Sequence, residues 1–159
     1  MDAWVQLTTD EYDHVWDRFC AAFSFRPSVH AKDFPGITES PPFITLDLFG
    51  DFDEQAIDEL DATLLTAFRK SVAPDHRLYA LDWQHDCYWF YPHRNADEPV
   101  IPIIPDGDYS IFLSQDFTFG TFGHPWERTL CVFGADLVSA IPSDLIDSLR
   151  IKRRGDGPT

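Results

Sequence analysis

The chain has 159 residues, the usual size of one domain, and its 44% of hydrophobic residues suffices for one core. Its 27 acidic residues exceed its 12 basic residues and give a formal net charge of -15 at pH 7, so the surface repels nucleic-acid phosphates and anionic lipid headgroups. The composition argues against nucleic acid and membrane as partners. It would speed encounter with a basic protein or a cationic small molecule, but surplus acid more often serves solubility, so charge alone identifies no partner.

The cysteines and the amino-terminal residues indicate the compartment. Cys20, Cys87 and Cys131 are far apart and form no Cys-x-x-Cys pair, which argues against a disulfide framework and a structural zinc site. The opening residues, MDAWVQLTTDEY, lack the basic segment and apolar stretch of a signal peptide. No run approaches the roughly 18 apolar residues of a membrane span. We therefore expect a soluble cytoplasmic protein.

Two amphipathic helices are predicted in the first half of the chain. Thr8 and Glu11 have capping-box spacing, and apolar residues then recur at three- and four-residue steps as far as Phe23. The second helix follows Asp53, which can cap it, and ends before Pro74.

Short runs rich in β-branched and aromatic residues predict five to six strands. They are residues 43–49, 78–83, 87–91, 108–114, 117–122 and 129–133. Most connections are too short for a parallel crossover, so we expect antiparallel pairing.

The predicted fold class is α+β. It consists of a mostly antiparallel twisted sheet of five to six strands, with two longer helices on one face and a short C-terminal helix. Residues 1–150 are expected to form a single domain, and the basic residues 151–159 a frayed C-terminal tail.

One polar segment lies between the second and third predicted strands. If the strand continues without a turn, Trp83 and His85 share one face, and Asp82 and Tyr88 share the other. If residues 84–86 form a turn, His85 lies at its tip, where neighbouring aspartates usually bond backbone amides. A carboxylate near the imidazole would favour its protonated form, which makes Asp82 and His85 candidates for acid–base catalysis.

A second polar segment is the Pro-Asp-Gly turn at residues 105–107. The turn explains this sequence structurally, and it also places Asp106 and Asp108 at the start of a strand. Both carboxylates are candidates for ligand binding at one edge of the sheet.

The third segment, Gly123-His124-Pro125-Trp126-Glu127, is predicted to reverse the chain. A turn alone does not explain why His124, Trp126 and Glu127 occur together. His124 and Glu127 are candidate catalytic residues. Trp126, with Trp83 and Tyr88, is a candidate wall of a pocket for a flat or cationic ligand.

Metal and nucleotide cofactors have little support. His85 and His124 with Asp82 or Glu127 would suit zinc or iron, but no characteristic spacing supports such a site. The glycines at 120 and 123 match neither the P-loop nor the dinucleotide fingerprint. We expect no metal and no cofactor.

Three strings together resemble a bacterial family known as domain of unknown function 2716. They are LYALDWQH at 78–85, PDGDYSIF at 105–112 and FGTFGHPWE at 119–127. The resemblance covers nearly the whole chain, and it implies a stand-alone bacterial domain without implying a mechanism.

Two functional hypotheses follow. The first is a non-catalytic binding protein, such as an acidic immunity or regulatory factor, that holds a basic partner or binds a ligand in an aromatic pocket. The alternative is a small-molecule enzyme with a His/carboxylate acid–base site. The enzyme requires Asp82, His85, His124 and Glu127 to surround a common cavity.

Overall fold

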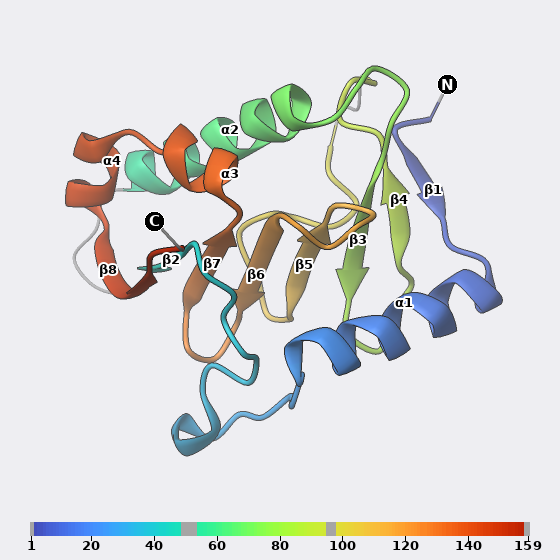
Figure 1. Cartoon of the computed structure of the whole chain (residues 1–159), viewed down its shortest axis with the longest axis horizontal. Helices are drawn as coiled ribbons and strands as arrows, with labels where there is room; N and C mark the ends of the chain where they lie inside the picture. The colour runs from blue at the N-terminus through green and yellow to red at the C-terminus, as the bar shows by residue number, and fades with distance from the viewer. Residues whose placement is uncertain (1, 49–53, 95–97, 158–159) are drawn as a thin grey trace.

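The computed structural model describes residues 2–48, 54–94 and 98–157, which form an α+β fold around one antiparallel sheet (Figure 1). The eight strands are β1 (Trp4–Gln6), β2 (Phe43–Asp47), β3 (Leu78–Asp82), β4 (Tyr88–Phe90), β5 (Ser110–Leu113), β6 (Gly120–His124), β7 (Thr129–Phe133) and β8 (Arg150–Gly155). Their order across the sheet is β1-β4-β3-β5-β6-β7-β2-β8, and every neighbouring pair is antiparallel.

Four α-helices and one 3-10 turn complete the described structure. They are α1 (Thr9–Phe23), α2 (Glu54–Ser71), α3 (Ala135–Ala140), α4 (Ser143–Ser148) and η1 (Ala31–Asp33). The predicted capping box of α1 is confirmed, because Thr8 N donates to Glu11 Oε1 at 2.9 Å and Glu11 N donates to Thr8 Oγ1 at 3.2 Å. The predicted cap of α2, Asp53, lies outside the described residues. None of the described helices combines the length and the apolar character that a membrane crossing requires.

The helices cover both faces of the sheet. Helix α1 lies on one face, and α2, α3 and α4 lie on the other (Figure 1). Phe19 of α1 stacks on Phe122 of β6 with ring centroids 6.3 Å apart, whereas Phe68 of α2 stacks on Phe112 of β5 at 5.5 Å. The prediction that both longer helices share one face is therefore wrong.

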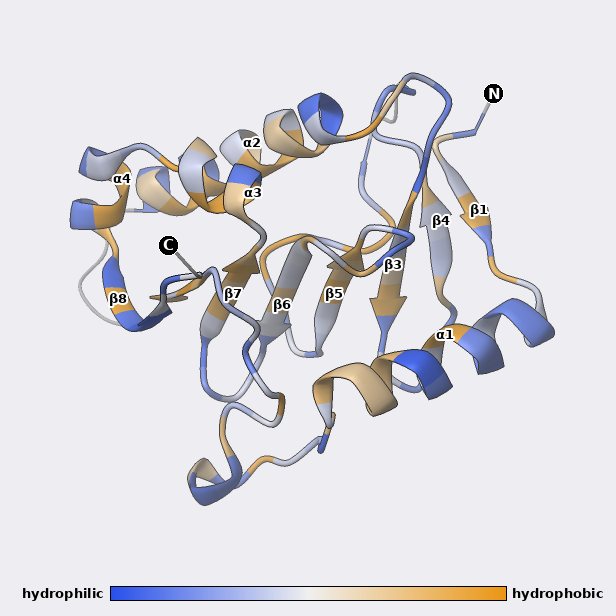
Figure 2. Cartoon of the chain, viewed as in Figure 1, coloured by the Kyte–Doolittle hydropathy of each residue, from blue (hydrophilic) through white to orange (hydrophobic). Residues whose placement is uncertain are grey.

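The reason lies in the central strands. All five residues of β7 are buried, and β3 and β7 are largely hydrophobic along their whole length (Figure 2). A strand whose side chains are apolar in both directions must be covered on both sides.

The sheet also has two strands more than the upper predicted number. β1 pairs with β4 at one edge, and β8 pairs with β2 at the other. The prediction of a frayed C-terminal tail is wrong for residues 151–155, which belong to β8. β6 occupies residues 120–124 instead of the predicted 117–122, so His124 lies inside a strand.

Candidate functional site

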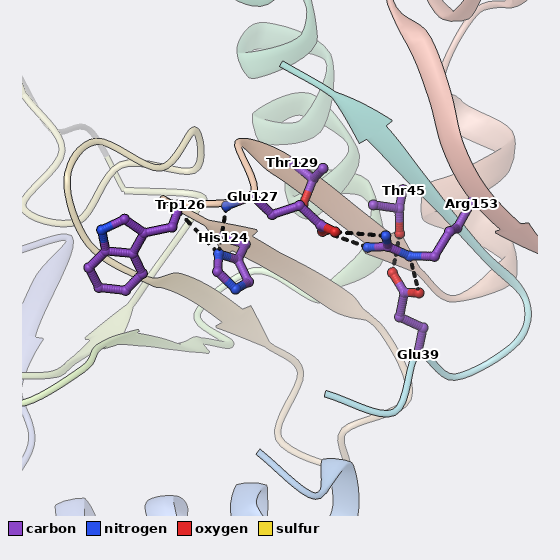
Figure 3. Close-up of polar contacts among 7 residues, drawn as sticks. All are labelled: Glu39, Thr45, His124, Trp126, Glu127, Thr129 and Arg153. Carbon is purple, nitrogen blue, oxygen red and sulfur yellow. Dashed lines mark hydrogen bonds and ion pairs between the residues drawn. The ribbon is translucent and has the colours of Figure 1, made fainter. Parts of the chain in front are cut away.

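The turn between β6 and β7 holds Trp126 at the surface. Residues 125–128 reverse the chain, and Arg128, whose φ is 59°, donates its N–H to His124 O at 2.9 Å. His124 Nδ1 accepts hydrogen bonds from the backbone N–H groups of Trp126, at 3.3 Å, and Glu127, at 3.1 Å (Figure 3). The imidazole thus fixes the conformation of the turn, and the Trp126 residue remains 41% exposed.

His124 itself is enclosed by aromatic rings. It is 1% exposed, and its ring centroid lies 4.4 Å from that of Phe34 and 4.9 Å from that of Tyr109. Burial lowers the pKa of His124 to about 4. Because Nδ1 accepts from two amides, the neutral ring carries its proton on Nε2. His124 is therefore a buried neutral acceptor that organises the turn, which makes it a poor proton donor to a surface ligand.

We expect His124 to make folding sensitive to acid. Its folded-state pKa of about 4 lies below the ordinary value of 6.5, so the unfolded chain binds the extra proton more readily. The stabilisation is complete above pH 6.5 and is lost as the pH falls towards 4, by about 3 kcal/mol. Urea unfolding from pH 7 to pH 4 should show this loss. His124→Asn, which keeps an acceptor and does not titrate, should lose less stability over this pH range. If the stability of this variant and of the parent protein fell equally with pH, His124 would not be the group responsible.

Glu127 belongs to a largely buried ion network on the side of the turn away from Trp126 (Figure 3). Arg153 Nη1 and Nη2 donate to Glu127 Oε2 and Oε1 at 2.8 and 2.6 Å, and Arg153 Nε donates to Glu39 Oε1 at 2.6 Å. Thr129 Oγ1 donates to Glu127 at 2.7 Å, and Thr45 Oγ1 donates to Glu39. Burial alone would raise the pKa of Glu127, but the bonds from Arg153 and Thr129 hold it below its ordinary value.

Figure 3 shows that Trp126 and Glu127 point in different directions from the same turn. Trp126 extends away from the ion network, while Glu127 reaches towards β8. Since both carboxylate oxygens of Glu127 are hydrogen-bonded to Arg153, Glu127 is neither free to orient His124 nor available to a ligand beside Trp126.

The other predicted catalytic residues gather around the turn between β3 and β4. His85 lies in this turn, as the hairpin alternative predicts, and its Nε2 is 3.1 Å from Asp108 Oδ2. One ligand atom each from Asp82, His85 and Asp108 lie within 4.8 Å of one another. Burial, followed by the adjacent Asp108, raises the pKa of Asp82 to about 7.

These three groups are a donor set that suits zinc, manganese or iron. In the described ranges no other group of three histidine, cysteine or acidic side chains has this proximity. The His85 side chain is 64% exposed, and a surface ion pair with Asp108 also accounts for the arrangement.

The four predicted catalytic residues do not share a cavity. Asp82 pairs with Ser110, and Ser110 pairs with Gly123, so these three residues face the same side of the sheet. His124, the next residue of β6, faces the opposite side. The structure therefore separates Asp82 and His85 from His124 and Glu127.

The predicted tryptophans do meet. Trp83 and Trp126 line a pocket of about 310 Å³ together with residues 27–30, and we call it the Trp pocket. The ring of Tyr109 contacts both tryptophans, with centroid distances of 5.9 Å to Trp83 and 5.4 Å to Trp126. The Tyr109 hydroxyl accepts from Ser28 N at 2.9 Å and donates to Ser28 O at 3.3 Å. These contacts hold the two rings and the loop in place without a ligand.

Two further predicted binding residues lie elsewhere. Tyr88 packs edge-on against Trp4, with centroids 6.3 Å apart, at the core on the α2 side. Asp106 lines a separate pocket of about 420 Å³ beside Pro125 and Arg128. Asp108 directly precedes Tyr109 and accepts its N–H at 2.8 Å, and its other carboxylate oxygen lies beside His85.

The sequence interpretation missed Ser28, Tyr109, Glu39 and Arg153 as functional or supporting residues. No local pattern reveals them, because the contacts join residues that are 81 and 114 positions apart. The basic run containing Arg153 resembles a solvated tail until its acidic partners are known.

Comparisons with known proteins agree with the resemblance. A family described as "Protein of unknown function (DUF2716)" matches residues 6–138. The chain is 30% identical to the "Uncharacterized protein YxiI" of Bacillus subtilis (strain 168) over 154 residues, which cover 89% of this chain and 93% of that protein. No solved structure matches. With this match over most of its length, the chain belongs to the DUF2716 family.

Proposed function

We propose that the protein is a non-catalytic binding protein whose Trp pocket receives a positively charged side chain of a basic partner. One observation carries the proposal: Trp83 and Trp126 both pack edge-on against Tyr109 and line one pocket together with residues 27–30. Aromatic faces attract cations.

The surroundings support a protein partner. Trp126 is an exposed tryptophan on a rigid turn, the kind of residue that contributes most to protein interfaces. The net charge of -15 would speed encounter with a basic surface. A cytoplasmic location forms part of the proposal, and it agrees with the free thiols of Cys20, Cys87 and Cys131.

An enzyme remains the second candidate because of Asp82. A carboxyl group whose pKa is raised to about 7 can exchange a proton near neutral pH, and His85 and Asp108 lie beside it. This smaller acid–base group replaces the four-residue centre that the sequence suggested. Catalysis there would be lost in Asp82→Asn, whereas binding in the Trp pocket would survive this substitution with at most a modest decrease.

A pair of matched probes tests the cation. We expect acetyl-arginine amide to shift the indole N–H signals of Trp83 and Trp126 in an NMR titration, and the neutral acetyl-citrulline amide to bind about tenfold more weakly. Trp126→Ala should abolish the difference between the probes. The same substitution should also weaken any complex with a basic protein captured at low salt.

Ile151→Ala is the control, because Ile151 is 40% exposed, close to the value for Trp126, and lies on β8 away from the pocket. This variant should bind the arginine probe as the parent protein does. Equal affinity of the two probes, or unchanged binding by Trp126→Ala, would rule out the Trp pocket as a cation site.

A further inference from the structure

A second pocket lies on the opposite face of the sheet, and we call it the α2 pocket. Its volume is about 190 Å³, and its floor consists of Trp4, Phe90 and Phe112. Trp4 stacks on Phe90 with centroids 4.4 Å apart and meets Phe112 edge-on at 6.2 Å. An apolar cavity of about 150 Å³ accommodates benzene, so this volume fits one aromatic ring with a short substituent.

Two arginines, Arg69 and Arg94, line the α2 pocket. Arg69 Nε donates to Pro92 O at 2.8 Å, and Arg94 Nη1 donates to Asp2 O at 2.9 Å. The Arg94 guanidinium also lies 3.6 Å from the centroid of the Tyr91 ring. Each arginine is therefore held in position by one nitrogen, which leaves other N–H groups for a ligand.

Within the described part of the chain, the arginine and tryptophan side chains that line this pocket have hydrogen-bond donors without matching acceptors. Among the residues that the structure describes, neither Arg69 nor Arg94 forms an ion pair. Within the same ranges, the buried nitrogens Trp4 Nε1 and Arg94 Nε have no hydrogen-bond partner. A set of donors and fixed cations next to an apolar cavity selects a molecule with an acceptor-rich, negatively charged end.

Asp61 makes one end of the α2 pocket negatively charged. Asp61 lines the pocket and precedes Arg69 by about two turns of α2, about 12 Å along the helix axis. Its carboxylate would repel an anion at its own end of the pocket, so the ligand's charge belongs at the arginine end.

We propose that the α2 pocket binds a small carboxylate with an apolar body the size of a single ring, with its carboxylate at Arg69 and Arg94. This site is separate from the Trp pocket and does not depend on the binding of a basic partner. The arginines also explain how a chain of strongly negative net charge would hold an anion.

Phenylacetate and phenylacetamide provide the test, because they share the ring and differ in charge. The readout is the indole N–H signal of Trp4, identified by its loss in Trp4→Phe. Phenylacetate should shift this signal and bind about tenfold more tightly than phenylacetamide. Arg69→Gln, at an exposed position, should remove most of that preference, and Arg69→Gln with Arg94→Gln should remove all of it.

Asp61→Asn is the matched control on the same helix, and it should bind phenylacetate at least as tightly as the parent chain. Trp126→Ala should leave phenylacetate binding unchanged, which separates this result from failure of the Trp pocket. Equal affinity for the acid and the amide, no shift of the Trp4 signal, or full binding by Arg69→Gln would overturn the proposal. Urea unfolding of each variant checks that the fold is intact. If the double variant does not fold, the binding preference of the single variant Arg69→Gln is the deciding result.

Discussion

Arg153→Ala is expected to lower the free energy of unfolding by about 3 to 5 kcal/mol at pH 7, because it leaves two buried carboxylates without their cation. The side chains of Glu127 and Glu39 are only 5% and 8% exposed, and Arg153 donates to both. Urea unfolding followed by far-UV circular dichroism measures the loss. Without Arg153, burial should raise the pKa of Glu127 above that of the unfolded chain, so the defect should become smaller as the pH falls towards 4.5.

Arg154→Ala is the matched control for this experiment. Arg154 is the next residue of the same strand and contacts Asp156 at 3.3 Å, but its side chain is 53% exposed and that of Asp156 is 84% exposed. Exposed pairs contribute little, so this variant should unfold within about 0.5 kcal/mol of the parent chain. Similar losses in the two variants would show that the network around Arg153 is not what stabilises the β2 and β8 edge.

Tyr109→Ala is expected to destabilise the protein by roughly 3 to 5 kcal/mol and to abolish binding in the Trp pocket. Tyr109 is completely buried, and its ring supports Trp83, Trp126 and His124. Removing the ring leaves a cavity beneath both walls of the pocket. The stability change is measured by urea unfolding and the binding by the arginine probe.

Tyr109→Phe separates the ring from the hydroxyl. This variant keeps the packing but leaves the Ser28 N–H without its acceptor, so it should cost about 1 to 2 kcal/mol. Hydrogen exchange at Ser28 should accelerate, and the arginine probe should bind more weakly without losing its preference over citrulline. If Tyr109→Phe and Tyr109→Ala reduce binding of the arginine probe equally, the hydrogen bonds of the hydroxyl to Ser28, and not the packing of the ring, maintain the Trp pocket.

The local parts of the fold were predictable from the sequence. The capping box at Thr8 and Glu11 and the antiparallel hairpin of β3 and β4, with His85 in its turn, depend on residues close together in the chain. The sequence predicts α1 and α2 on the same face of the sheet, and this placement is wrong. Strand β7, Thr129–Phe133, contains the corrective signal, since an unbroken buried strand requires cover on both faces.

The site was predictable only as a set of residue types. The sequence identifies Trp83 and Trp126 as candidate pocket walls, and Asp108 as a candidate ligand-binding residue at one edge of the sheet. Tyr109, against which both tryptophans pack, looks like an ordinary strand residue. His124 looked catalytic because sequence does not reveal burial, and it is burial that keeps this imidazole neutral.

The order of the strands has a consequence for synthesis on the ribosome. β2 is made early, yet both of its neighbours, β7 and β8, begin at residue 129 or later. Residues 43–47 therefore emerge from the exit tunnel long before either neighbouring strand is synthesised. Until most of the chain has been translated, β2 has no pairing partner, and Ile44 and Leu46, which are buried in the folded protein, are exposed to solvent. During this interval the nascent polypeptide is open to chaperones, and a stalled ribosome would release a fragment prone to aggregation.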